Sequence, residues 1–280
     1  ASNNTAVGHS ALGANTTGTQ NVAVGALALD AITTSSNNTA VGYGVLTDNT
    51  SGTGLSAVGT NALTNNTTGD YNTAMGTGCM EAHTTGDHNT AFGYLALDAS
   101  TTSTKNTAVG SNALGANNAD QNTAMGYYAL STNSTGTTNT AIGVQSMHLN
   151  TTGSRNTAIG HFSLDANTTA DRNTAMGFQA LTTNTTGSYN TAVGDAALEA
   201  NSTGHNNCAF GQAALAQNTT ANGNTAVGTF CMDANTTGTN NCAVGLHALG
   251  SNTTASYNSA FGHGALQSNV TGAENTAVGL

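Results

Sequence analysis

The side chains able to perform catalysis or bind metals are few and scattered along this chain of 280 residues. Eight histidines occupy unrelated places, and three of them, His9, His161 and His263, directly follow the Gly of an Ala-apolar-Gly triplet. Catalysis and metal binding both require several such groups converging on one concave site. We therefore expect no catalytic residue, no metal site and no cofactor, and we predict that the protein is not an enzyme.

Acidic residues prefer one place, directly after the Leu or Met of an Ala-Leu-like pair. Stacked carboxylates can bind Ca²⁺, but such sites need several oxygen ligands from each turn in a fixed motif. Because the acids are sparse and rarely neighbour one another, solvated loop charges that discourage aggregation are the preferred interpretation. These residues are Asp30, Glu81, Asp98, Asp165, Glu199 and Asp233.

A third candidate chemistry is N-glycosylation, because Asn-Thr-Thr recurs along the chain and matches the acceptor motif. A turn whose geometry simply favours Asn and Thr would produce the same pattern, and we prefer that interpretation. The candidate glycan acceptors are Asn15, Asn66, Asn150, Asn167, Asn184, Asn235 and Asn252.

All of these residues belong to one repeat, in which an Ala-apolar-Gly triplet recurs almost every 17 residues from Gly8 to Gly279. Counted from its opening Asn as position 1, one copy reads Asn-Thr-Ala-Val-Gly-x-x-Ala-Leu-x-x-Asn-Thr-Thr-Gly-x-x. So short a period indicates a solenoid, whose turns bury apolar side chains only against neighbouring turns. We predict an all-β parallel β-solenoid, or β-roll, of about sixteen stacked 17-residue coils. Residues 1–280 are expected to form a single domain without an internal boundary.

Within one copy, the pattern predicts two short strands, one over positions 1–4 and one around the Ala-Leu pair. The Gly at position 5 is expected to form a corner with positive φ, where a Cβ would clash. The Asn at positions 1 and 12 can bond the same amide in the next turn, so columns of Asn should fix the stacking. One copy, between Gly110 and Gly126, is a residue short, and we place the missing residue in a loop.

Adjacent residues of a strand point to opposite faces, so the Ala at position 3 and the large apolar residue at position 4 require two buried faces. One face can close the interior, and the other then needs a partner, most simply in a trimer of parallel chains. The alternative is that a bend turns both side chains inward. The predicted structural core is represented by Ala6, Val7, Gly8, Leu12, Ala141, Ile142, Gly143, Met147, Ala277, Val278 and Gly279.

The net charge of −10 includes only three basic residues, Lys105, Arg155 and Arg172. Nucleic acids need a basic stripe that displaces counterions from phosphates, so we exclude them as partners.

The apolar runs are far shorter than the roughly 20 residues that cross a bilayer, so we expect no membrane insertion. Cys208 and Cys242 lie two turns apart, roughly 9 to 10 Å and beyond disulfide reach, so we interpret all four cysteines as small buried fillers.

Aromatic residues occupy variable places that we expect to be exposed, mostly just after the position-5 Gly. They could stack on sugars or contact another fibre, or they could shield the edges of the core. The candidate contact aromatics are Tyr43, Tyr94, Tyr127, Tyr128, Phe162 and Phe178.

The Asn-Thr-Ala-Val-Gly-x-x-Ala-Leu-x-x-Asn-Thr-Thr-Gly motif of residues 4–280 resembles the 17-residue repeats of bacterial and phage tail-fibre-domain proteins. It is similar, less closely, to the head repeats of trimeric autotransporter adhesins, in which Asn-Ser-x-Ala-Ile-Gly builds a left-handed parallel β-roll in a trimer. This resemblance implies a fibre at the cell or virion surface with an adhesive or spacer role and no catalysis.

We therefore predict a non-catalytic extracellular fibre shaft or adhesin head that presents a repeated polar surface. Its expected partners are further copies of itself, most simply in a trimer, and cell-surface glycans or other fibre subunits. One alternative is a self-assembling, glycosylated extracellular filament built by end-to-end joining, because both ends stop within a motif. An ice-binding solenoid is a third hypothesis, although adjacent threonines point to opposite faces and no regular Thr-x-Thr ladder is present.

Overall fold

The computed structural model describes residues 1–280, which form short strands, turns and bends and no helix. The chain is an all-β parallel β-solenoid of about sixteen turns, as predicted. It divides into two compact units, Ala1–Thr138 and Asn139–Leu280, which are described separately. No helix of the length and apolar character needed to span a membrane is present. The expectation of one domain across both units stays a prediction.

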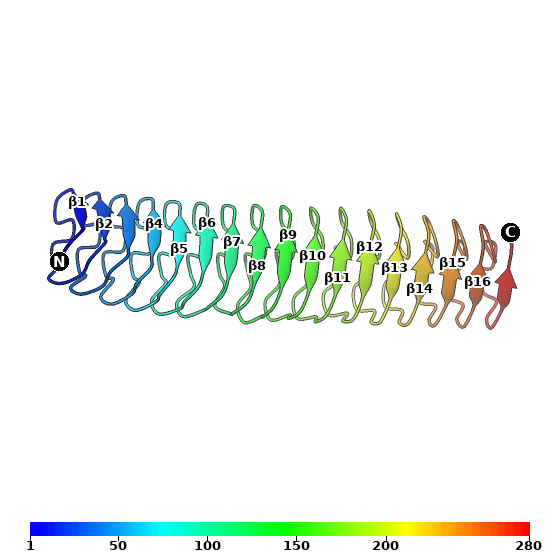
Figure 1. The fold of residues 1–280 in the computed structure, drawn as a ribbon. Helices are drawn as coiled ribbons and strands as arrows, with labels where there is room; N and C mark the ends of the chain where they lie inside the picture. The colour runs from blue at the N-terminus through cyan, green and yellow to red at the C-terminus, as the bar shows by residue number, and fades with distance from the viewer. The chain divides into compact units, whose positions relative to one another are not determined.

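Each turn contributes one three-residue strand at positions 2–4 of the repeat, and within each unit the strands lie side by side in chain order (Figure 1). The first unit holds β1 (Thr5–Val7), β2 (Val22–Val24), β3 (Thr39–Val41), β4 (Ser56–Val58), β5 (Thr73–Met75), β6 (Thr90–Phe92), β7 (Thr107–Val109) and β8 (Thr123–Met125). The second holds β9 (Thr140–Ile142), β10 (Thr157–Ile159), β11 (Thr174–Met176), β12 (Thr191–Val193), β13 (Cys208–Phe210), β14 (Thr225–Val227), β15 (Cys242–Val244), β16 (Ser259–Phe261) and β17 (Thr276–Val278).

The strands of each unit pair in parallel and in strict register. Position 3 of one strand lies opposite position 3 of the next, as Ala23 does with Ala40 and Ala158 with Ala175. Identical repeat positions therefore form columns along each unit, so the chemistry of a whole face follows from a single copy.

The second strand expected around the Ala-Leu pair does not form. Positions 7 and 9 have left-handed backbone in every turn, as at Gln179 (φ 52°) and Leu181 (φ 55°). Such residues close tight turns and cannot extend a strand. The segment still bonds from turn to turn, because the Leu181 N–H donates to the Ala197 carbonyl at 2.9 Å.

The Gly at position 5 does form the predicted corner. Its φ lies between 127° at Gly279 and 146° at Gly93, a region that L-residues avoid. A Cβ on Gly177 would lie 2.3 Å from the carbonyl oxygen of Gly194 in the following turn. Only glycine lets successive turns approach this closely.

The interior of each unit is thin, because it is filled mostly by the alanines at positions 3 and 8 and the Leu or Met at position 9. Ala141 and Met147 are completely buried, as are their counterparts in nearly every other turn. At the ends of the described chain, Ala6 is exposed, and Leu12 and Ala277 are half-buried. Gly143 is half-buried, whereas Gly8 and Gly279 are exposed.

The short copy leaves the sheet undisturbed. Thr107 still pairs with Thr123, although only 16 residues separate them. The missing residue is absorbed in the loop, as predicted, where the Asn117 amide donates to the Ala119 carbonyl at 2.7 Å instead of reaching three residues ahead.

Candidate functional site

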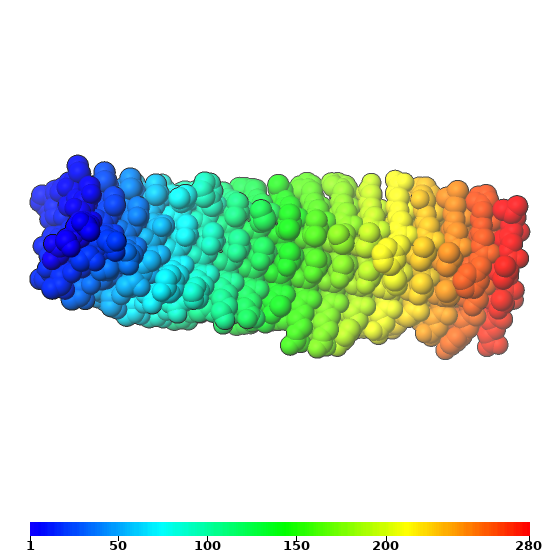
Figure 2. All heavy atoms as spheres, in the orientation of Figure 1, coloured from blue at the N-terminus to red at the C-terminus, as the bar shows by residue number.

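The structure contains no pocket, and no group of three or more His, Cys, Asp or Glu side chains could hold a metal ion. Within each unit the successive turns appear as closely packed bands (Figure 2). The chemistry of this protein must therefore be sought in columns of identical positions, of which two polar columns lie in the interior and several others form surfaces.

The interior column at position 12 is a ladder of buried amides. The Asn201 Nδ2 donates to the Asn184 Oδ1 of the preceding turn at 2.9 Å and to the Gly204 carbonyl at 3.1 Å. The Asn218 Nδ2 donates in turn to the Asn201 Oδ1 at 2.9 Å. The Asn201 amide is thus satisfied by the turns on either side, as predicted from the Asn column.

The second interior column, at position 1, bonds to the same carbonyls. The Asn190 Oδ1 accepts the backbone N–H of Asn207 at 2.9 Å, and its Nδ2 donates to the Gly204 carbonyl at 2.8 Å. The Gly204 carbonyl therefore receives one amide from each column. This shared acceptor joins the two Asn columns, so every turn is held to its neighbours by polar contacts that require a fixed register.

Three substitutions interrupt the position-12 column. Ile32, His83 and Ser100 stand where other turns carry Asn, and all three are fully buried. As a result, the Oδ1 atoms of Asn15 and Asn66 in the preceding turns are buried without a hydrogen-bond partner. These orphaned oxygens show that each turn depends on the residue in the next one.

The amide ladder overturns the glycosylation hypothesis for the folded chain. The candidate acceptors all occupy position 12, where Asn66 and Asn167 are completely buried, and Asn15 is half-buried. In Asn167 the Nδ2 that would carry a sugar donates to the Asn150 Oδ1 at 2.7 Å and to the Ala170 carbonyl at 3.1 Å. The same inward orientation holds for Asn150, Asn184, Asn235 and Asn252. The Asn-Thr-Thr pattern reflects turn geometry.

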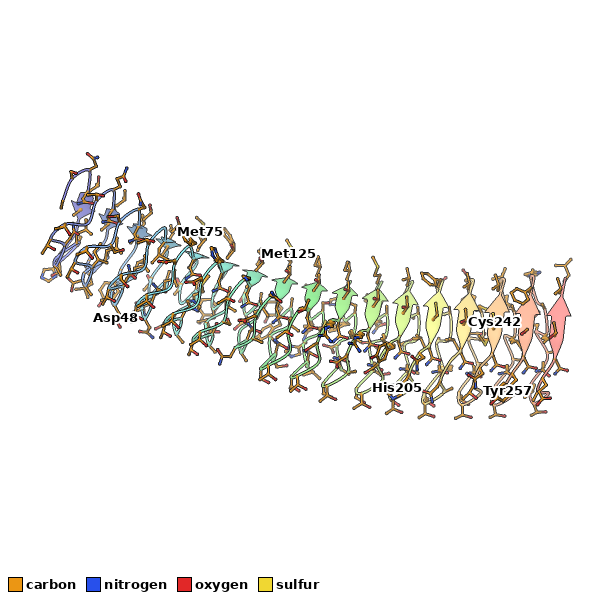
Figure 3. The ribbon with its side chains drawn as sticks, turned by 60° about the horizontal axis from the view of Figure 1, so that its bottom comes forward. Asp48, Met75, Met125, His205, Cys242 and Tyr257 are labelled. Carbon is orange, nitrogen blue, oxygen red and sulfur yellow. The ribbon has the colours of Figure 1, made fainter.

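The side chains at positions 2 and 4 of every strand form a surface that we call the outer sheet face. Position 3 points inward and position 4 outward, so the alternative in which a bend turns both inward is wrong. Val7, Ile142 and Val278, which we had placed in the core, lie on this outer face. Met75 and Met125 project away from the sheet in Figure 3.

The candidate contact aromatics lie at positions 6 and 7. Tyr43, Tyr94, Tyr127 and Phe178 at position 6 are about half exposed, whereas Tyr128 and Phe162 at position 7 are partly covered. Tyr127 and Tyr128 meet edge to face with centroids 4.4 Å apart. His161 lies beside both Phe162 and Phe178, with centroid distances of 3.9 and 5.7 Å.

The acidic column at position 10 is half-buried, not freely solvated as expected. Desolvation raises the pKa of Asp98, Asp165 and Asp233, and the negative charge of Glu81 raises that of Asp98 further. Burial therefore makes the charged form of these three carboxylates less favourable than it would be in water.

The four cysteines are free thiols. Cys79 and Cys231 at position 8 are fully buried, and desolvation raises the pKa of each to about 12. They are inert interior fillers, as predicted. Cys208 and Cys242 instead occupy position 2 and are half-buried on the outer sheet face.

The sequence analysis missed a column of side-chain acceptors at position 16. The Asp70 Oδ1 accepts the backbone N–H of Thr53 in the preceding turn at 2.7 Å, and the Asp171 Oδ1 accepts that of Ser154 at 2.7 Å. Ser188 and His205 perform the same role through Oγ and Nδ1. The preference of this position for Asp, Ser, Thr and Asn was the available signal.

No known protein family and no curated protein matches this chain. The resemblance to tail-fibre and autotransporter repeats is therefore carried by the repeat motif and the β-solenoid fold alone.

Proposed function

We propose that this protein is a non-catalytic structural element of an extracellular fibre, acting as a shaft or adhesin head at a cell or virion surface. The observation that carries the proposal is the pair of interior Asn columns, which run unbroken through the second unit and through most turns of the first. In nearly every turn the repeated Asn side chains form hydrogen bonds to a neighbouring turn. No turn forms a pocket.

Several features support a spacer role over a chemical one. Each turn satisfies its neighbours through the same atoms, so turns can be added or removed without new interactions. The exposed aromatics at position 6 could contact neighbouring fibre subunits or cell-surface glycans by stacking. We further propose that copies of the chain associate, most simply as a trimer, because the apolar position-4 column is left uncovered in the single chain.

The spacer role predicts that turns are interchangeable modules. Deleting residues 156–206 removes three complete copies in phase, and we expect a folded protein whose longest dimension in solution X-ray scattering shortens by about 14 Å. A matched control deletes residues 156–198, which breaks the phase and should prevent folding. Loss of folding in the in-phase deletion would contradict the modular spacer.

The location predicts that the chain is accessible from outside. Antibodies raised against the folded protein should label intact cells or particles of its native source without permeabilisation. Labelling that appears only after permeabilisation would contradict an extracellular fibre. The non-catalytic assignment has its own test, because hydrolase activity measured in the purified protein would contradict it.

A further inference from the structure

We infer that the outer sheet face is the surface through which copies of this chain pack against one another. This inference rests on the proposed fibre function and adds the surface and the partner, a second copy of the same chain. The observation behind it is that position 4 is always apolar although it is exposed to solvent in the single chain.

Position 4 holds only Val, Ile, Met or Phe in all seventeen strands, yet the single chain leaves it in contact with solvent. Phe92 is 56% exposed, and Met125 and Phe210 are each 42% exposed. An exposed strand position tolerates polar residues, and nothing inside the chain explains their absence here. Contiguous apolar surface of this kind on an otherwise polar protein marks an interaction site.

The rest of the outer sheet face suits burial. Position 2 contains only Thr, Ser, Cys or Val, so no strand places a charged residue on this face. Packing would therefore bury no unpaired charge, which is the costliest obstacle to association. The short side chains at position 2 also let a partner approach the sheet closely beside the taller position-4 column.

The spacing of the columns identifies the partner. Side chains at position 4 repeat with the strand spacing of about 4.8 Å, and another copy presents knobs and gaps with the same repeat. The column is also uneven, because Phe210 stands between Val193 and Val227. Uneven side chains can interdigitate with a protein face but disrupt the flat, regular array that an ice lattice would need.

The available area is sufficient for a stable contact. With side chains of roughly 150 Å² or more, the nine position-4 residues of the second unit expose on the order of 500 Å². The half-buried position-2 column adds to this, which brings the face close to the roughly 800 Å² that each partner contributes to a typical interface.

The first test introduces charges into this face of the full chain. The triple variant Phe210→Lys, Val227→Glu and Val244→Lys alternates sign, so neighbouring strands attract and the fold is retained. The matched control places the same charges at exposed position-14 residues of the same turns, as Thr220→Lys, Thr237→Glu and Thr254→Lys. Circular dichroism checks that both variants remain folded.

Sedimentation measures the outcome. We expect the wild-type protein and the control to be oligomers at about 0.1 mM, and the face variant to dissociate at least about tenfold more readily. Association that is equally tight in the face variant, or a wild-type monomer, would overturn the inference. A monomer whose length still follows the number of turns would leave the spacer function standing.

A second measurement uses the unmodified protein. Cys208 and Cys242 lie on the outer sheet face, whereas Cys79 and Cys231 are buried inside the chain. Maleimide should label the first pair faster after dilution into the monomer range, while the buried pair stays unreactive as an internal control. An oligomer in which Cys208 and Cys242 react as fast as in the monomer would show that another surface mediates association.

Discussion

Replacing His83 by asparagine should stabilise the protein and remove a pH dependence. The His83 ring is fully buried in the position-12 column, and its Nε2 donates to the Gly86 carbonyl at 2.8 Å. Its Nδ1 has no partner, and neither has the Asn66 Oδ1 in the preceding turn. An asparagine at this position can donate through Nδ2 to both the Gly86 carbonyl and the Asn66 Oδ1, as other turns do.

The pH dependence follows from the direction of the pKa shift. Desolvation lowers the pKa of His83 below its usual 6.5, against the backbone hydrogen bond at Gly86 and the charge of Asp87, which raise it. Above pH 6.5 the ring is neutral in both states and contributes no pH dependence. As the pH falls below 6.5, the unfolded chain binds a proton that the folded chain resists, so the free energy of unfolding decreases.

The expected magnitudes separate the two effects. At pH 7.5, pairing the Asn66 Oδ1 should raise the free energy of unfolding by about 1 kcal/mol. Between pH 7.5 and 5.5, the wild-type protein should lose up to about 1.4 kcal/mol that the variant retains. The raised pKa values of Asp98, Asp165 and Asp233 are common to both proteins and cancel in the comparison.

Urea denaturation followed by circular dichroism at the two pH values measures both effects. His263→Asn is the control, because His263 is exposed and its replacement makes the same change of residue type outside the position-12 column. If wild-type and His83→Asn proteins lose stability equally on acidification, the claim that His83 is held neutral by burial is refuted. If His83→Asn is less stable at pH 7.5, the ladder argument fails.

Three further predictions concern the columns. Asn167→Ala should cost about 2 to 4 kcal/mol in urea denaturation, because it orphans buried groups in both adjacent turns, whereas Thr169→Ala at exposed position 14 should change little. Gly177→Ala should prevent folding as judged by circular dichroism, since its Cβ would strike the next turn, and tolerance of the alanine would refute the close approach. Ala196→Gly should raise the free energy of unfolding in urea by about 0.5 kcal/mol, since its φ of 54° strains alanine more than glycine's flexibility costs, and a lowered free energy would contradict this.

The fold could be predicted from the sequence at positions where one residue type predominates for a physical reason. Gly177 at its corner and Asn184 in its column are such cases, because a Cβ or a missing amide would break contact with the next turn. The second predicted strand failed because Leu181 has left-handed backbone, which costs an L-residue about 1 to 2 kcal/mol on its own. The residue types around Leu181 do not indicate this left-handed conformation, because it is imposed by the stacking of neighbouring turns.

Some surface features could likewise be predicted from the sequence and others could not. Strand alternation correctly separated Ala141 from Ile142, because side-chain direction in a strand follows from residue count alone. The glycosylation motif failed at Asn167, because the motif names the residues of a turn without saying which way its amide points. The position-16 acceptors were missed for a related reason, since Asp171 acts through one oxygen on the turn before it.

The polar interior explains why a chain with so thin an apolar core can hold one register. Alanine contacts change little if one turn slides against the next, whereas a displaced Asn184 or Asn190 would leave buried amide groups unpaired. The Asn columns therefore fix the register, and a fixed register is what aligns position 4 into a continuous column within each unit. An outer sheet face able to match a second copy thus depends on amides on the opposite side of the sheet.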